Sequence, residues 1–66
     1  MFTLTIHTDN AAFLGDPGPE VARILRRTAD RIAAGEATGL FQTIFDINGN
    51  DVGRFKLGDV YAAEGQ

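Results

Sequence analysis

Carboxylates and side-chain amides alternate in one short stretch of the chain. Asp46, Asn48 and Asn50 stand where a calcium-binding loop of the helix-loop-helix type has its first, third and fifth ligands. The sixth position is Asp51, where such a loop needs glycine, and the twelfth is Leu57, where it needs a bidentate glutamate. We therefore expect a polar hairpin turn here and no metal site.

Side chains that could act as nucleophiles or bases are scarce. The chain has no cysteine and no serine, and His7 is its single histidine. These absences exclude Ser-His-Asp and Cys-His catalysis and any zinc site built on cysteine. Asp46 and Asp51 lie close in sequence, but exposed carboxylates at a hairpin tip lack the burial that separates such a pair into acid and base. We predict no enzyme activity and no cofactor.

The remaining acidic residues suggest a binding surface. The net charge is −3, which does not suit a general nucleic-acid binder, because phosphate contacts need positive charge. If the turn aspartates gather at one end of the domain, they would attract a partner with a basic groove and compete there with nucleic acid. A purely local role stays open, since aspartate is common in turns. The aspartates predicted for this contact are Asp9, Asp16, Asp46, Asp51 and Asp59.

Positive charge is concentrated in one predicted helix. Residues 20–34 contain four arginines and two acids. On the solvent side of a helix these arginines could contact phosphates, so a small nucleic-acid-associated regulator is the alternative function. Glu20 and Asp30 lie at spacings that pair part of this charge within the helix. The predicted nucleic-acid contacts are Arg23, Arg27 and Arg31.

One strand, one helix and one hairpin must position these charges. Residues 1–8 alternate apolar side chains with threonine and histidine, which is typical of a half-buried strand. Asn48-Gly49, between the β-rich segments 40–47 and 52–57, indicates a hairpin. Between them, apolar residues at helical spacing predict a helix that ends at Gly35, and its stripe comprises Val21, Ile24, Leu25, Thr28 and Ile32.

This order of elements predicts an α+β fold of the type βαββ, in which one helix packs on one face of a three-stranded antiparallel sheet. Hairpin loops of two, three or four residues stay open and would pair different side chains; a four-residue loop at residues 48–51 would set Ile44 opposite Phe55. The opposite face, partly exposed, would then carry an apolar patch that marks a binding surface or a dimer contact. An assembly or oligomerisation module is therefore a further alternative. The residues of this face are Phe41, Phe45, Ile47 and Val52, of which Phe41 and Phe45 are the predicted apolar partner contacts.

A single domain accounts for the whole length. A chain of 66 residues buries only about 60% of the surface that it exposes when unfolded, which leaves room for one core. We expect residues 1–66 to form this domain, with a loosely ordered tail at residues 58–66, as a monomer or a weak homodimer. Without a long apolar run or a signal-peptide pattern, the sequence indicates a cytoplasmic protein with no membrane partner.

Two segments together resemble small proteins encoded by bacteriophages and prophages. They are the turn sequence from Asp46 to Gly53, followed by Phe55 and Leu57, and the helix sequence from Glu20 to Asp30. The likeness covers roughly residues 1–57 and extends to the anti-CRISPR class of inhibitors. It implies a non-catalytic protein of the bacterial host cell that binds a Cas effector, such as a type I effector subunit. Such inhibitors block DNA recruitment or cleavage, often through an acidic surface that imitates DNA.

Overall fold

The computed structural model describes residues 1–37 and 39–58. A first strand is followed by a short 3-10 helix, one long helix and two further strands. The predicted tail, residues 58–66, lies outside the described residues apart from Gly58. In the described part of the chain, no helix is long and apolar enough to cross a membrane. The elements are β1 (Thr3–Ile6), η1 (Ala11–Phe13), α1 (Gly18–Ala33), β2 (Gln42–Phe45) and β3 (Asp51–Lys56).

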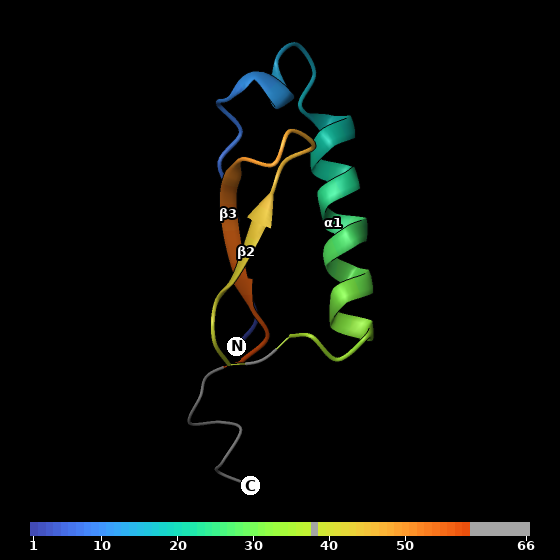
Figure 1. Cartoon of the computed structure of the whole chain (residues 1–66), viewed down its shortest axis with the longest axis vertical. Coiled ribbons are helices and arrows are strands. Elements are labelled where there is room, and N and C mark those ends of the chain that lie inside the picture. The colour runs from blue at the N-terminus through green and yellow to red at the C-terminus, as the bar shows by residue number, and fades with distance from the viewer. Residues whose placement is uncertain (38, 59–66) are drawn as a thin grey trace, which may run out of the picture.

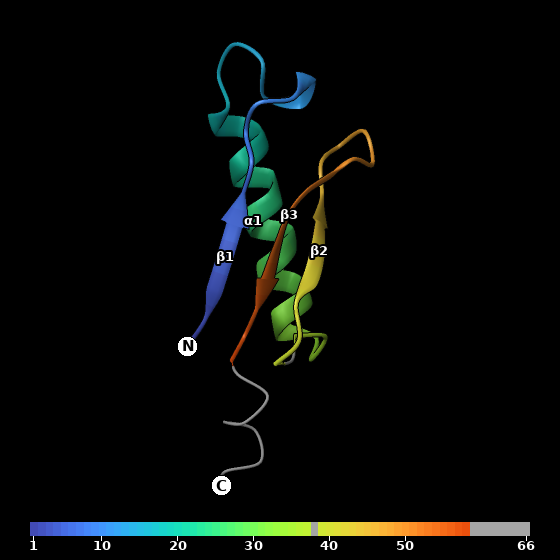
Figure 2. The ribbon, with the colours of Figure 1, turned by 90° about the vertical axis from the view of Figure 1, so that its left-hand side faces the viewer.

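The three strands form one antiparallel sheet in the order β1-β3-β2. Helix α1 lies against one face of this sheet, and the other face is uncovered by the described chain (Figure 2). The predicted βαββ fold is therefore confirmed. Because β3 is the central strand, β1 and β2 are both edge strands, and each has one side without a neighbouring strand in the part of the chain that the structure describes.

Local sequence signals set both ends of α1. The Asp16 carboxylate accepts a hydrogen bond from the backbone N–H of Gly18 at 2.9 Å, and Pro17 and Pro19 flank the start. At the other end Gly35 has a φ of 85°, in the left-handed region that favours glycine. The N–H of Glu36 then donates to the carbonyl of Arg31 at 3.0 Å, which closes the helix with a Schellman motif.

The hairpin has a three-residue loop, one of the lengths that the sequence left open. The Asp46 N–H donates to the Asn50 carbonyl at 2.9 Å, so the loop is residues 47–49, and Gly49 takes a φ of 84°. Ile44 lies opposite Gly53, so the pairing of Ile44 with Phe55 that a four-residue loop would give is wrong. The register shifts by one residue between Ile44, which lies opposite Gly53, and Phe45, which lies opposite Asp51. The residue of β3 between Asp51 and Gly53 is therefore unpaired.

That unpaired residue is Val52, and the bulge turns its side chain into the core. Val52 is 3% exposed, so its predicted place on the uncovered face is wrong. The sequence pattern alone could not reveal this, because a bulge adds one residue to the alternation of sides along a strand. The buried apolar core consists of Phe13, Ile24, Ile44, Val52 and Phe55.

The helix stripe is narrower than predicted. Ile24 and Thr28 are buried, and Val21 and Ile32 are half-buried against the core. Leu25 is 46% exposed, so its predicted place in the core is wrong. The line through Ile24 and Thr28 faces the sheet, and Leu25 stands to one side of it because successive helix positions are about 100° apart.

Candidate functional site: the acidic end

Three segments that are far apart in sequence meet at one end of the molecule. Figure 1 shows the loop from β1 to α1, the first turn of α1 and the tip of the β2–β3 hairpin together, at the end away from the N-terminus. Residues 7–20 and 46–51 contain five carboxylates and neither arginine nor lysine. We call this group the acidic end, and its members are Asp9, Asp16, Glu20, Asp46 and Asp51.

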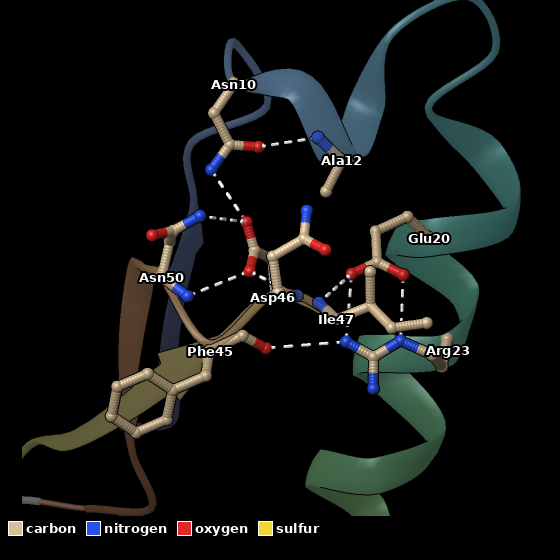
Figure 3. A network of polar contacts seen from close by, with 9 residues as sticks. Asn10, Ala12, Glu20, Arg23, Phe45, Asp46, Ile47 and Asn50 are labelled. Atoms are coloured by element: carbon tan, nitrogen blue, oxygen red, sulfur yellow. Dashed lines mark hydrogen bonds and ion pairs between the residues drawn. The ribbon is translucent and has the colours of Figure 1, made fainter.

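Asp46 is the centre of the hydrogen bonds at this end. Its Oδ1 accepts from the backbone N–H groups of Asn48 and Asn50 at 2.8 and 2.9 Å. Its Oδ2 accepts from the side-chain amides of Asn10 at 2.8 Å and Asn50 at 3.3 Å (Figure 3). The backbone bond from Asn50, together with these other donors, lowers the pKa of Asp46 despite burial.

Through Asn10, this carboxylate connects the hairpin to the first loop. The Asn10 Oδ1 accepts a hydrogen bond from the Ala12 N–H at 3.1 Å, which caps η1. The short helix in turn carries Phe13, which is 3% exposed, into the core. One buried carboxylate therefore fixes two loops that are 36 residues apart in the chain.

A second buried carboxylate joins the hairpin to α1. Glu20 accepts two hydrogen bonds from the Arg23 guanidinium, at 2.8 and 2.9 Å, and its Oε2 also accepts the Ile47 N–H at 2.9 Å (Figure 3). The bond from Arg23 is the main cause that lowers the pKa of Glu20, and Glu20 raises the pKa of Arg23. Both buried carboxylates thus stay ionised at neutral pH and hold the hairpin tip in one position.

The predicted acidic contacts fall into two kinds. Asp9, Asp16 and Asp51 are exposed. Asp46 is 5% exposed, so it adds negative charge to the acidic end while its oxygens hold the fold together. Our expectation of an exposed, solvated carboxylate at position 46 is wrong. Asp59 lies outside the described residues.

The predicted apolar contacts lie elsewhere, on the uncovered face of the sheet. Phe45 is exposed and directly precedes the acidic end in the chain. Phe41 is also exposed, and the charged groups of Arg54 and Lys56 lie 4.6 and 4.8 Å from the centre of its ring. These distances are those of cation–π contacts. Phe41 therefore packs against cationic side chains, and Asp51 is the predicted aspartate that lines the same hollow of the uncovered face.

Two of the three arginines predicted to contact phosphate form hydrogen bonds within the protein. Arg23 pairs with Glu20 and reaches the Phe45 carbonyl at 3.5 Å. Arg31 donates to the Thr43 carbonyl at 3.0 Å, and its guanidinium lies 5.0 Å from the Phe55 ring centre. Both side chains thus turn toward β2. Of the three, Arg27 is exposed.

Sequence reasoning missed two residues of this site. The helical spacing predicts only an ion pair within α1 for Glu20, and no sequence pattern singles out Asn10. Nothing local to Asn10 indicates a bond to Asp46, because that contact depends on how the loops meet. The sequence signal for the role of Asp46 is its place at the start of the Asp46, Asn48, Asn50 alternation. An aspartate at the start of a turn commonly accepts a hydrogen bond from the backbone N–H two residues later, as Asp46 does from Asn48. Within residues 1–37 and 39–58 no group of three or more histidine and carboxylate side chains could hold a metal ion.

In comparisons with known proteins, no family model, no curated protein and no solved structure matches this chain.

Proposed function

We propose that this chain is a non-catalytic binding protein that places its acidic end in the basic nucleic-acid groove of a partner protein and so blocks that groove. The partner proposed is a type I Cas effector of the bacterial host, as the resemblance to phage-encoded inhibitors implies, and the site of action is the host cytoplasm. The observation that carries the proposal is the gathering of five carboxylates at one end of the fold.

The charge pattern around this end supports the proposal. Two arginines lie three residues from the acidic end in the sequence. Arg23 is held by Glu20 in a two-point ion pair and adds little positive field there, and the guanidinium of Arg54 lies over the Phe41 ring. The exposed carboxylates of Asp9, Asp16 and Asp51 remain to meet a cationic surface. Complementary potentials of this kind speed the encounter of two proteins and fix their orientation.

Rigidity supports it as well. Asp46 and Glu20 tie the loop, the helix and the hairpin tip together before any partner arrives. A surface that is already ordered loses less conformational entropy on binding than a set of free loops. The acidic end is therefore suited to present its charges in a fixed arrangement, as a groove that binds a regular polyanion requires.

The proposal is tested by titrating the purified chain into a purified type I effector complex and measuring affinity at low and high salt. We expect affinity to fall by at least about tenfold between 50 and 500 mM salt, because the contact is electrostatic. The triple variant Asp9→Asn, Asp16→Asn, Asp51→Asn should lose affinity to a similar extent at low salt. Asparagine keeps the oxygens that accept from Gly18 and Gly53, so the fold should persist.

A matched control removes two carboxylates away from the acidic end. The double variant Asp30→Asn, Glu36→Gln removes two negative charges, against three in the triple variant, and should bind almost as the parent does. Equal losses in both variants, or binding indifferent to salt, would contradict the proposal. Tight binding of duplex DNA by the chain alone, lost on replacing Arg27, would favour the nucleic-acid regulator instead.

A further inference from the structure

The outer edge of β1 has unused backbone hydrogen-bonding groups. The His7 N–H donates to the Val52 carbonyl at 2.7 Å, so His7 faces β3. Along an antiparallel strand the backbone groups of alternate residues point to opposite sides, which turns those of Leu4 and Ile6 away from β3. Within residues 1–37 and 39–58, no hydrogen bond reaches these outward groups of Leu4 and Ile6.

The core is also incompletely covered on this side. Glu20, Arg23 and Arg31 all reach toward β2, so the flank of α1 on the other side of Ile24 points toward β1. That flank carries Leu25, which is 46% exposed. On β1 itself Leu4 and Ile6 are only half-buried against the core, and Phe2 is 48% exposed. Apolar side chains thus line the open edge from both the strand and the helix.

No acidic residue, lysine or arginine protects this edge. Residues 1–8 contain no aspartate, glutamate, lysine or arginine. Exposed edge strands in monomeric proteins usually carry lysine, proline or a bulge that prevents pairing with another strand. The strand β1 has none of these features. It pairs with β3 without a register shift, and the bulge described above lies between β2 and β3.

We propose that the open edge of β1 binds a second copy of this chain, by antiparallel pairing of β1 with the β1 of that copy. The two-fold axis passes beside Thr5, so that Leu4 of each copy pairs with Ile6 of the other. In this register the backbone N–H and carbonyl groups of Leu4 and Ile6 form hydrogen bonds with those of the other copy. The two three-stranded sheets thereby join into one continuous sheet. The Leu25 flanks of the two helices then lie on the same face, beside the axis.

Self-pairing fits better than other occupants for two reasons. A two-fold contact needs a surface that is complementary to itself, and an uncharged antiparallel strand with its open residues placed evenly about Thr5 meets that condition. A 66-residue chain whose described part has five buried apolar residues also has a small core, which association through an apolar edge would extend. An interface of one short strand and one helix flank falls in the class below about 1,200 Å², so the dimer is weak and reversible.

A cysteine at position 5 tests both the dimer and its register. The parent chain has no cysteine, so a single Thr5→Cys substitution gives a unique thiol. Because the Thr5 backbone faces β3, Thr5 and its copy form a non-hydrogen-bonded pair, with Cα atoms about 4.5 Å apart, within the range that a disulfide spans. With oxidised glutathione as oxidant, we expect Thr5→Cys to form a covalent dimer at micromolar concentration.

The controls are cysteines with similar surroundings and different partners. Thr43→Cys lies on the same uncovered face but on β2, and Thr3→Cys lies on β1 but faces His7 of the other copy. Both should cross-link at least about tenfold more slowly than Thr5→Cys. Equal cross-linking of all three variants would show random collision and overturn the proposal. So would a Thr5→Cys chain that stays monomeric, as it would if another segment of the same chain covered the edge.

Sedimentation equilibrium gives a second, non-covalent measurement. The parent should show an average mass that rises with concentration. Thr5→Glu should remain a monomer, because two carboxylates would face each other across the axis, whereas within one chain the new side chain sits opposite Arg54 and is tolerated. A parent that is monomeric at millimolar concentration, or a Thr5→Glu variant that associates as strongly as the parent, would contradict the proposed dimer.

Discussion

The two edges of the sheet are treated in opposite ways. At the β2 edge the carbonyls of Thr43 and Phe45 accept hydrogen bonds from Arg31 and Arg23, and the N–H of Ile47 donates to Glu20. At the β1 edge the outward groups have no partner within the described residues. The difference shows that a single helix can close one side of a small sheet with polar side chains while leaving the other side apolar and open.

The spacing of residues along α1 explains this asymmetry. Glu20, Arg23 and Arg31 lie at helical spacings that place them on one flank, and they face β2. Val21 and Leu25 lie on the other flank, and they leave β1 without a polar cover. Different interactions therefore hold the two edge strands in place. Side chains of α1 form hydrogen bonds with the β2 side, whereas β1 is held by apolar packing and by its backbone pairing with β3.

The largest effect is expected where β1 joins β3. A methyl group at Gly53 would collide with the Thr5 carbonyl oxygen, which is backbone and cannot swing away. We expect Gly53→Ala to destabilise the domain by more than about 3 kcal/mol, enough to unfold a chain of this size or release β1. Chemical denaturation followed by circular dichroism measures this. Gly58→Ala, where the added methyl meets only open space, should melt like the parent.

Asp46→Asn tests the β2 side and should have the next largest effect. The new amide group cannot accept from Asn10 and Asn50, so the half-buried Asn10 and the exposed Asn50 lose a charged acceptor, at a cost of about 1.5–3 kcal/mol. Asp51→Asn, at an exposed position that keeps its accepting oxygen, is the control. A variant at position 46 as stable as this control would refute the structural role of Asp46.

Acid should weaken the same side of the molecule. Folding lowers the pKa of Asp46 and of Glu20. Their contribution to stability is therefore fully present above the unfolded values near pH 4, and it is lost as pH falls through the lower folded values. Thermal melts between pH 7 and pH 2 should show this loss below about pH 4. The loss should be smaller in Asp46→Asn, and an equal acid sensitivity in that variant would exclude Asp46 as a source.

Removing the arginines from β2 should make the two edges alike. The double variant Arg23→Ala, Arg31→Ala frees the carbonyls of Thr43 and Phe45 and leaves the buried Glu20 without its ion-pair partner, so we expect a loss of stability of about 2–3 kcal/mol. We also expect stronger self-association than in the parent, measured by light scattering, because a second open edge is created. Arg26→Ala changes an exposed arginine and should leave association unchanged. Unaltered association in the double variant would show that the arginines do not protect the edge.

The smallest effect is expected at the apolar flank. Leu25→Ala should cost less than about 1 kcal/mol in the monomer, because about half of the side chain is already in water. Ile24→Ala, one residue earlier and buried, should cost about 2–5 kcal/mol. Denaturant melts at micromolar concentration compare the two, and equal losses would mean that the helix is rotated relative to the structure described above.

Much of the fold follows from local signals in the sequence. Asn48-Gly49 gives the hairpin, Gly35 ends the helix, and the alternation in residues 1–8 gives the first strand. The loop length and the bulge at Val52 do not follow, because an Asn-Gly pair suits loops of several lengths and a bulge changes which side chains face the core. Leu25 was misplaced because helix periodicity cannot tell the edge of an apolar stripe from its centre.

The acidic end was only partly predictable. That turn aspartates fall at one end follows from the fold, because the β1–α1 loop and the β2–β3 hairpin tip lie at the same end of the sheet. The burial of Asp46 depends on the long-range contact with Asn10, and the burial of Glu20 on the reach of the Ile47 N–H. Contacts between segments so far apart leave no periodic trace in the sequence.

Arg23 and Arg31 bind backbone carbonyl oxygens of β2, and within residues 1–37 and 39–58 neither forms a hydrogen bond with the side chain of Thr43. Every amino acid has the same backbone carbonyl, so substitutions at positions 43 and 45 keep the hydrogen bonds from Arg31 and Arg23. The outer surface of β2 is therefore a region in which the chain is free to vary its chemistry, and to change what it recognises, without giving up its architecture.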